Sequence, residues 1–131
     1  MKSLQDKIHY TFRDESILNN ALTHSSYANE AKRGLSSNER LEFLGDAVLS
    51  IVVSDHIYRY FDHLPEGELT KIRSALVCEK SLCGFARQLG LGEYLLLSRG
   101  EQHTGGRERP SILADAFEAL IAAIYIDGGM E

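Results

Sequence analysis

Two pairs of acidic residues have the types and spacing to perform chemistry. Glu42 and Asp46 lie in one mostly apolar segment, and Asp115 and Glu118 lie in another, far along the chain. At i,i+3 or i,i+4 spacing, both carboxylates of a pair share one face of a helix. A buried carboxylate without a partner is costly, so it shifts its pKa, finds a partner or coordinates a metal. Because Mg²⁺ prefers hard oxygen ligands, the sequence predicts one divalent-metal site formed by both segments.

The segment with the first pair is predicted to form one long helix, roughly over residues 37–61. It is apolar on nearly every side of a helical wheel, a pattern typical of a buried helix. Glu39, Glu42 and Asp46 fall within an arc of about 60° on this wheel. Gly45 lies in the middle of the segment, where it costs up to about 1 kcal/mol relative to Ala. We expect it to permit close approach by another helix or by a substrate.

The segment with the second pair is predicted to be a helix over residues 110–125. Pro110 suits its first turn, and residues 102–109 before it indicate a loop. A single acidic pair on a helix is usually solvated. Two such pairs, each set in an apolar helix, favour the metal site instead.

The rest of the chain also indicates helices, so the predicted fold class is all-α. Asp14 is a good N-cap, and Gly90 suits the end of a helix. Residues 29–38 are polar and indicate a loop, while residues 94–97 are the only candidate for extended structure. The additional predicted helices cover residues 4–8, 14–22, 69–77 and 81–89.

Composition limits the class of protein. The 131 residues are 44% hydrophobic and 25% charged, which is ordinary for one globular domain. Asp46 and Asp55 bracket the longest apolar run, so no membrane span or membrane partner is expected. Cys78 and Cys83 fit neither a zinc nor a redox spacing, and we expect them to be packing residues of a cytoplasmic protein. The net charge of −5 is unusual for a phosphate-binding protein, but a bound divalent ion would reverse the local sign.

The stretch from Asn38 to Asp46, with the sequence NERLEFLGD, resembles the signature of the ribonuclease III family. These proteins are metal-dependent endonucleases of double-stranded RNA. Residues 21–27, 66–70 and 112–120 are also similar to the family and follow in its order. The resemblance covers essentially all 131 residues and is closest to the short bacterial form. It implies a helical bundle around a long central helix and a homodimer.

The resemblance also implies a reaction and a set of catalytic residues. Glu42, Asp115 and Glu118 would bind magnesium, or manganese as a substitute, and Asp46 would join them or orient a ligand or water. No small-molecule cofactor beyond the metal is expected. Cleavage of double-stranded RNA would leave 5′-phosphate and 3′-hydroxyl ends with short 3′ overhangs, as in the processing of rRNA and mRNA.

For each of four further residues the sequence allows two roles. Glu39 either bonds the backbone at the helix start, since Ser36 and Glu39 have capping-box spacing, or lies beside the RNA. Glu66 either favours the dipole of its own helix or adds an acid to the family's cleavage valley. Phe43 is either a core residue or, as the family implies, an aromatic residue inserted into the partner subunit. For His24 a structural role is favoured over catalysis.

By resemblance, residues 1–131 are the endonuclease domain. Bacterial members carry a double-stranded-RNA-binding domain after the position of Asp127, and this domain is absent here. The chain is therefore either truncated or dependent on a partner for affinity. A catalytically silent RNA-binding or ribosome-associated relative is one alternative, although it should have lost the acids. A di-iron carboxylate protein is another, but it needs Glu-x-x-His pairs, which do not occur in this sequence.

Overall fold

The computed structural model describes residues 2–31 and 36–129, and every regular element in these ranges is helical. The all-α prediction is confirmed. None of the described helices is long and apolar enough to cross a membrane. The elements in chain order are α1 (Lys2–Ile8), α2 (Glu15–Ala21), α3 (Ser25–Ala31), α4 (Glu39–Tyr60), α5 (Glu66–Leu76), α6 (Glu79–Gln88), the 3₁₀ helix η1 (Leu91–Tyr94), α7 (Arg99–His103), the 3₁₀ helix η2 (Gly106–Glu108) and α8 (Pro110–Gly128).

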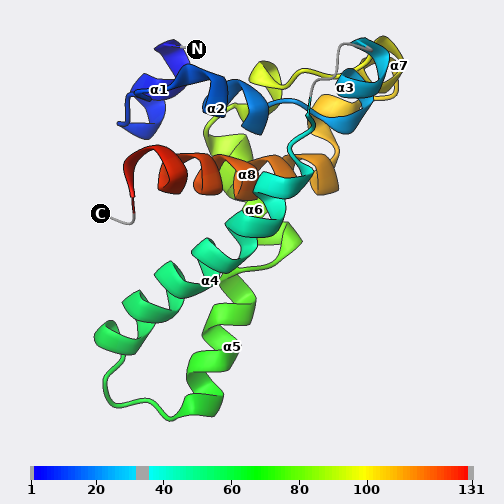
Figure 1. The fold of residues 1–131 in the computed structure, drawn as a ribbon. Helices are drawn as coiled ribbons and strands as arrows, with labels where there is room; N and C mark the ends of the chain where they lie inside the picture. The colour runs from blue at the N-terminus through cyan, green and yellow to red at the C-terminus, as the bar shows by residue number, and fades with distance from the viewer. Residues whose placement is uncertain (1, 32–35, 130–131) are drawn as a thin grey trace.

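Helix α8 lies at the centre of the fold, with α4 crossing it and α2 and α6 packed against it (Figure 1). Its sequence explains this position, because small buried residues along it allow neighbouring helices to approach closely. Pro110 begins the helix as predicted. The buried alanines of α8 are Ala114, Ala116, Ala119, Ala122 and Ala123.

Helix α4 is long but only partly buried, so the expectation of a fully buried helix is wrong. Its N-terminal half crosses α8, whereas its C-terminal half pairs with α5 to form an arm that projects from the rest of the molecule (Figure 1). Along α4 the side chains of Phe43 and Ile51 are 83% and 57% exposed. Helix α5 has no buried residue. The apolar residues of α4 therefore form an exposed surface as well as part of the core.

The crossing of α4 and α8 depends on Gly45. A Cβ atom at this position would overlap the backbone carbonyl of Glu118. The prediction that Gly45 permits close approach by another helix is confirmed. The contact also brings the segment around Asp46 against the turn of α8 that carries Glu118.

Replacing Gly45 by Ala should therefore destabilise the protein although Ala is the better helix former. Overpacking against backbone should lower the free energy of unfolding by about 1–3 kcal/mol, more than the ~1 kcal/mol gained in helix propensity. Gly84→Ala is a matched control, because Gly84 lies within α6 and a Cβ atom added there would have no neighbour within 4 Å. Urea denaturation would measure both, and equal stability of the two variants would contradict the role of the crossing.

The N-terminal helices are joined to the start of α4 by backbone hydrogen bonds. Asp14 caps α2 as predicted, accepting from the Ser16 N–H at 3.0 Å. Thr23 forms an isolated bridge with Leu96, so extended structure in residues 94–97 is limited to this point. The Asn38 N–H donates to the Thr23 carbonyl at 2.8 Å.

Two predicted loops are partly wrong. Helix α3 extends to residue 31, into the predicted loop over residues 29–38, of which residues 32–35 lie outside the described part of the chain. The predicted loop over residues 102–109 contains the end of α7 and all of η2. All three of these elements are short and polar, so they lack the apolar periodicity from which a helix is recognised.

Candidate metal centre

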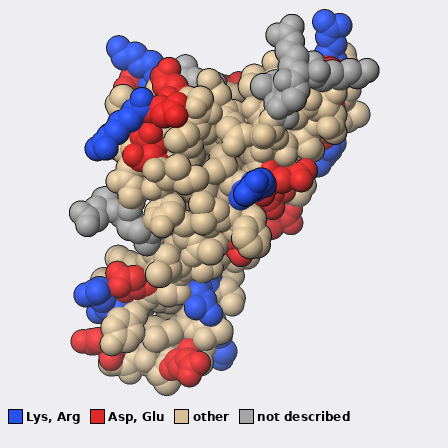
Figure 2. All heavy atoms as spheres, viewed as in Figure 1, with Lys and Arg blue, Asp and Glu red and all other residues tan. Residues whose placement is uncertain are grey.

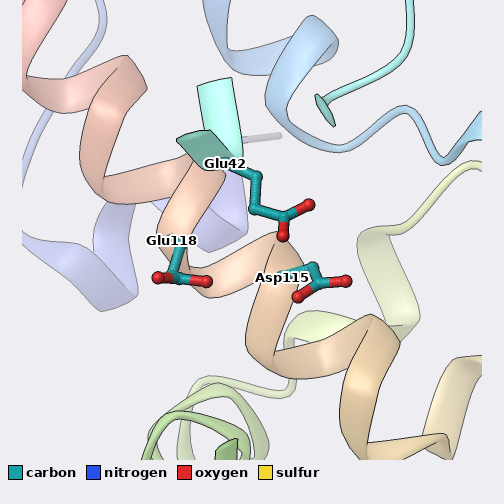
Figure 3. Close-up of side chains that lie close together, drawn as sticks. All are labelled: Glu42, Asp115 and Glu118. Atoms are coloured by element: carbon teal, nitrogen blue, oxygen red, sulfur yellow. The ribbon is translucent and has the colours of Figure 1, made fainter. Parts of the chain in front are cut away.

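Three carboxylates from two helices converge beside the crossing of α4 and α8. Glu42 belongs to α4, and Asp115 and Glu118 lie one turn apart on α8. Figure 3 shows the Glu42 carboxylate pointing toward the two acids of α8. One oxygen of each residue lies within 4.8 Å of the others, and all three side chains are half-buried. This set of hard oxygen donors fits a divalent cation such as Mg²⁺.

The convergence shifts the pKa of Glu42. Burial is the largest cause, followed by the charge of Asp115 and a hydrogen bond to it, and together with other acids they raise the pKa of Glu42 to about 7. Burial also raises the pKa of Asp115, although the hydrogen bond from Glu42 opposes the rise. Below about pH 7 the protonated Glu42 of the metal-free domain therefore donates a hydrogen bond to Asp115.

Glu118 forms a second hydrogen-bonded pair of acids, with Asp46. Burial raises the pKa of Glu118 to about 8, with a hydrogen bond to Asp46 as the next cause and the charges of the neighbouring acids adding to it. Asp46 itself is exposed. It lies outside the group of three close oxygens but beside it, so the structure places all four predicted acids in one region.

No side chain in the described part of the chain forms an ion pair with these acids. The ion pairs found in residues 2–31 and 36–129 involve other acids, namely Asp55, Asp62, Glu68 and Glu101. Like charges at this separation disfavour one another's ionised forms. A bound divalent ion would remove this penalty, because it would replace the bound protons with positive charge.

A small cavity of about 240 Å³ opens onto the acids and is walled on one side by the start of α6. This wall contributes Glu79, whose charge raises the pKa of Asp115. His24 acts on Asp115 in the opposite direction and lowers its pKa. Sequence reasoning did not place Glu79 here, because it lies on a different helix and is not part of an acidic pair. The remaining lining residues of the cavity are Asp46, Val77, Cys78, Leu82, Ala114, Asp115 and Glu118.

The two auxiliary acids occupy different places. Glu39 is exposed on the first turn of α4, and its charge contributes to the raised pKa of Glu42. The backbone N–H of Glu39 donates to Ser37 Oγ at 3.3 Å, so Ser37 rather than the predicted Ser36 provides the bond at the helix start. Glu66 begins α5 at the end of the arm, far from the crossing of α4 and α8 (Figure 1).

Phe43 points out of the molecule beside a large cavity of about 870 Å³. The interpretation of Phe43 as a core residue is therefore wrong. Exposed apolar residues continue from it along α4 and to the end of α8, where Ile126 is 50% exposed. Much of the same face carries no charged side chain (Figure 2). The lining of the cavity is Asn20, Ser36, Ser37, Glu39, Arg40, Leu41, Phe43, Leu44 and Ile126.

Comparisons with known proteins identify relatives that are ribonucleases. The chain is 56% identical over 131 residues to Ribonuclease 3 of Geobacillus kaustophilus, covering 99% of this chain and 53% of that relative. It is 54% identical over 132 residues to Ribonuclease 3 of Oceanobacillus iheyensis, with coverage of 100% and 58%. The chain thus spans little more than half the length of these curated relatives.

Solved structures give the same result. The nuclease domain of ribonuclease III from Campylobacter jejuni superposes with a TM-score of 0.92 at 46% identity, over 98% of this chain and 87% of that one. The report of that structure concerns flexibility in a region involved in dimer formation. Dicer from Pichia stipitis matches with a TM-score of 0.66 at 30% identity, over 92% of this chain and 49% of that one. Residues 14–131 match the ribonuclease-III-like family, and the chain belongs to this family.

Proposed function

We propose that this chain is the catalytic domain of a ribonuclease III-type endoribonuclease that cleaves double-stranded RNA with magnesium, or with manganese in its place. The observation that carries the proposal is the convergence of Glu42, Asp115 and Glu118, none of which forms an ion pair within the described residues. Family membership supports it, because the matched relatives are ribonucleases. Residues 1–131 would form the endonuclease domain, which would act on rRNA and mRNA in the cytoplasm.

The roles of the acids follow from their positions. Glu42, Asp115 and Glu118 would hold the cation, and Asp46, which hydrogen-bonds Glu118, would orient that carboxylate or a water. A bound divalent cation supplies a water of lowered pKa and stabilises charge on the reacting phosphate oxygens. Hydrolysis would leave 5′-phosphate and 3′-hydroxyl ends. RNA would be selected by the shape of its A-form grooves and by its 2′-hydroxyls.

The exposed apolar face supports a homodimer. An aromatic side chain that is 83% exposed beside a large cavity suits an isologous contact, in which each subunit offers the same projection and the same recess. We propose that Phe43 of one subunit enters the cavity of its partner. Two acidic clusters in one dimer would then cut the two strands and produce short 3′ overhangs.

Replacing Phe43 by Ala should weaken the dimer by about 30-fold or more, as expected for a buried aromatic anchor. Sedimentation analysis over a range of concentrations would measure the dissociation constant. Tyr58→Ala is a matched control, because Tyr58 is 70% exposed on the same helix but on the arm. Equal dissociation constants for the wild type and the Phe43 variant would show that Phe43 does not contribute to the dimer interface.

The nuclease activity is tested by incubating the domain with a long RNA duplex, with and without magnesium, and analysing the fragment ends. Fragments with 5′-phosphates and short 3′ overhangs are expected only with magnesium. A duplex that stays intact with both magnesium and manganese would contradict the proposal. Binding of intact duplex would then favour the catalytically silent relative, although such a relative has no need for the four acids that lie together here.

A further inference from the structure

His24 lies between α2 and α3, where backbone hydrogen bonds tie it to two other parts of the chain. Its N–H donates to the Leu96 carbonyl at 3.1 Å, and the carbonyl of the preceding Thr23 accepts from Asn38 at 2.8 Å. Asn38 directly precedes α4, and its carbonyl accepts from the Glu42 N–H at 2.8 Å. His24 is therefore held beside the turn of α4 that carries Glu42.

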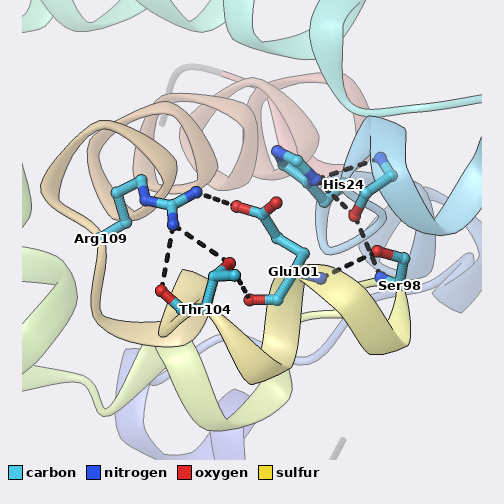
Figure 4. Close-up of polar contacts among 6 residues, drawn as sticks. His24, Ser98, Glu101, Thr104 and Arg109 are labelled. Atoms are coloured by element: carbon cyan, nitrogen blue, oxygen red, sulfur yellow. Dashed lines mark hydrogen bonds and ion pairs between the residues drawn. The ribbon is translucent and has the colours of Figure 1, made fainter.

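Hydrogen bonds also fix the orientation of the His24 ring (Figure 4). Nδ1 accepts from the Ser26 N–H at 3.1 Å and lies 2.8 Å from Ser26 Oγ. Ser26 Oγ accepts from the Ser98 N–H at 3.0 Å, so its own proton is available for Nδ1. With Nδ1 as the acceptor, the neutral ring carries its proton on Nε2. Within the described part of the chain Nε2 has no hydrogen-bond partner, so this N–H is free to donate.

Once they are ionised, the carboxylates of the acidic cluster provide no such donor. They can then only accept, and the charges of Glu39, Asp46 and Glu79 add to the negative field around them. His24 lies close enough to act against this field, since it lowers the pKa of Asp115. A 2′-hydroxyl of RNA could donate to a carboxylate directly. A phosphate oxygen can only accept, and it therefore needs a donor at the edge of the cluster.

We propose that His24 contacts the substrate, its Nε2–H donating a hydrogen bond to a non-bridging phosphate oxygen of the RNA strand held at the acidic cluster. This inference rests on the nuclease function proposed above. It gives the two ring nitrogens different roles. Nδ1 stabilises the fold through its hydrogen bonds to Ser26, and Nε2 binds RNA. A purely structural histidine would use only the first.

Two amide substitutions separate the two nitrogens. His24→Asn places an amide oxygen near the position of Nδ1 and removes the donor at Nε2, whereas His24→Gln places an amide N–H near Nε2 and loses the Nδ1 acceptor. RNA affinity is measured by fluorescence anisotropy with a short duplex and calcium, which also binds oxygen ligands. Cleavage is measured as kcat/KM with magnesium, and folding as Tm.

His24→Asn should weaken RNA affinity and kcat/KM by about tenfold or more while keeping its Tm near that of the wild type. His24→Gln should stay within about threefold of the wild type in both RNA measurements despite a lower Tm. The reverse order would show a structural role and overturn the inference. If the wild type cleaves RNA and His24→Asn matches it, only the inference on His24 fails. If the wild type neither binds nor cleaves the duplex, the proposed function fails as well.

Discussion

Glu118→Gln should abolish cleavage of duplex RNA while making the metal-free domain more stable. The variant loses one carboxylate of the close group of three, and we expect kcat/KM to fall by about a thousandfold or more. Its amide N–H can still donate to Asp46, as the protonated carboxyl does. The amide has no charge to bury, so at pH 8 the Tm should rise by about 4 °C, or roughly 1 kcal/mol after allowance for solvent screening.

Glu93→Gln is the matched control, because Glu93 is an exposed acid away from the cluster. It should change neither cleavage nor Tm measurably. Single-turnover cleavage and thermal melts in EDTA measure the two effects of Glu118→Gln separately. Cleavage at the wild-type rate would show that Glu118 is not a ligand of the metal centre. A Tm below that of the wild type at pH 8 would show that burying the ionised Glu118 carboxylate does not destabilise the fold.

In the absence of metal the domain should become less stable as the pH rises from about 5 to 8. An ordinary Glu ionises with a pKa of 4.5, whereas the pKa values are about 7 for Glu42 and about 8 for Glu118 in the folded domain. Within this window the folded state binds more protons than the unfolded state, so each rise in pH favours unfolding. The lowered pKa of Asp127 acts at lower pH, so it does not offset the trend.

Magnesium should reverse this dependence. A cation replaces the protons on Glu42 and Glu118, so its apparent affinity rises with pH. At millimolar magnesium and pH 8 the Tm should exceed that in EDTA by about 5–10 °C, and the difference should shrink toward pH 5.5. Thermal melts at matched ionic strength test this. A metal-free Tm that stays constant from pH 5 to 8 would contradict the raised pKa values.

Much of this fold could be predicted from local patterns. The two long helices have apolar residues throughout, Asp14 and Pro110 mark helix starts through their own backbone chemistry, and Gly45 signals a close contact because it is otherwise unfavourable in a helix. Predicting that the acids on α4 and α8 would meet required that the two helices pack with their acidic faces together, as the family resemblance implied. These features are strong because each depends on a few neighbouring residues.

Other features depend on tertiary structure and could not be predicted in this way. Apolar periodicity does not distinguish a core from an open face, so the pattern alone could not decide whether Phe43 is a core residue or an interface residue. Glu79 and His24 reach the acids from separate elements, and no spacing in the sequence relates them to Glu42. The short polar helix α3 lacks an apolar stripe altogether.

Because α4 and α8 cross at Gly45, an ion bound at the metal centre would also link the two helices. The acids that this crossing brings together are separated in sequence by the arm, α6 and α7. An ion held between α4 and α8 would close this long loop much as a covalent cross-link does, with a correspondingly large entropic effect on the unfolded chain. The ion would then resist separation of the two helices, and its release would require them to open.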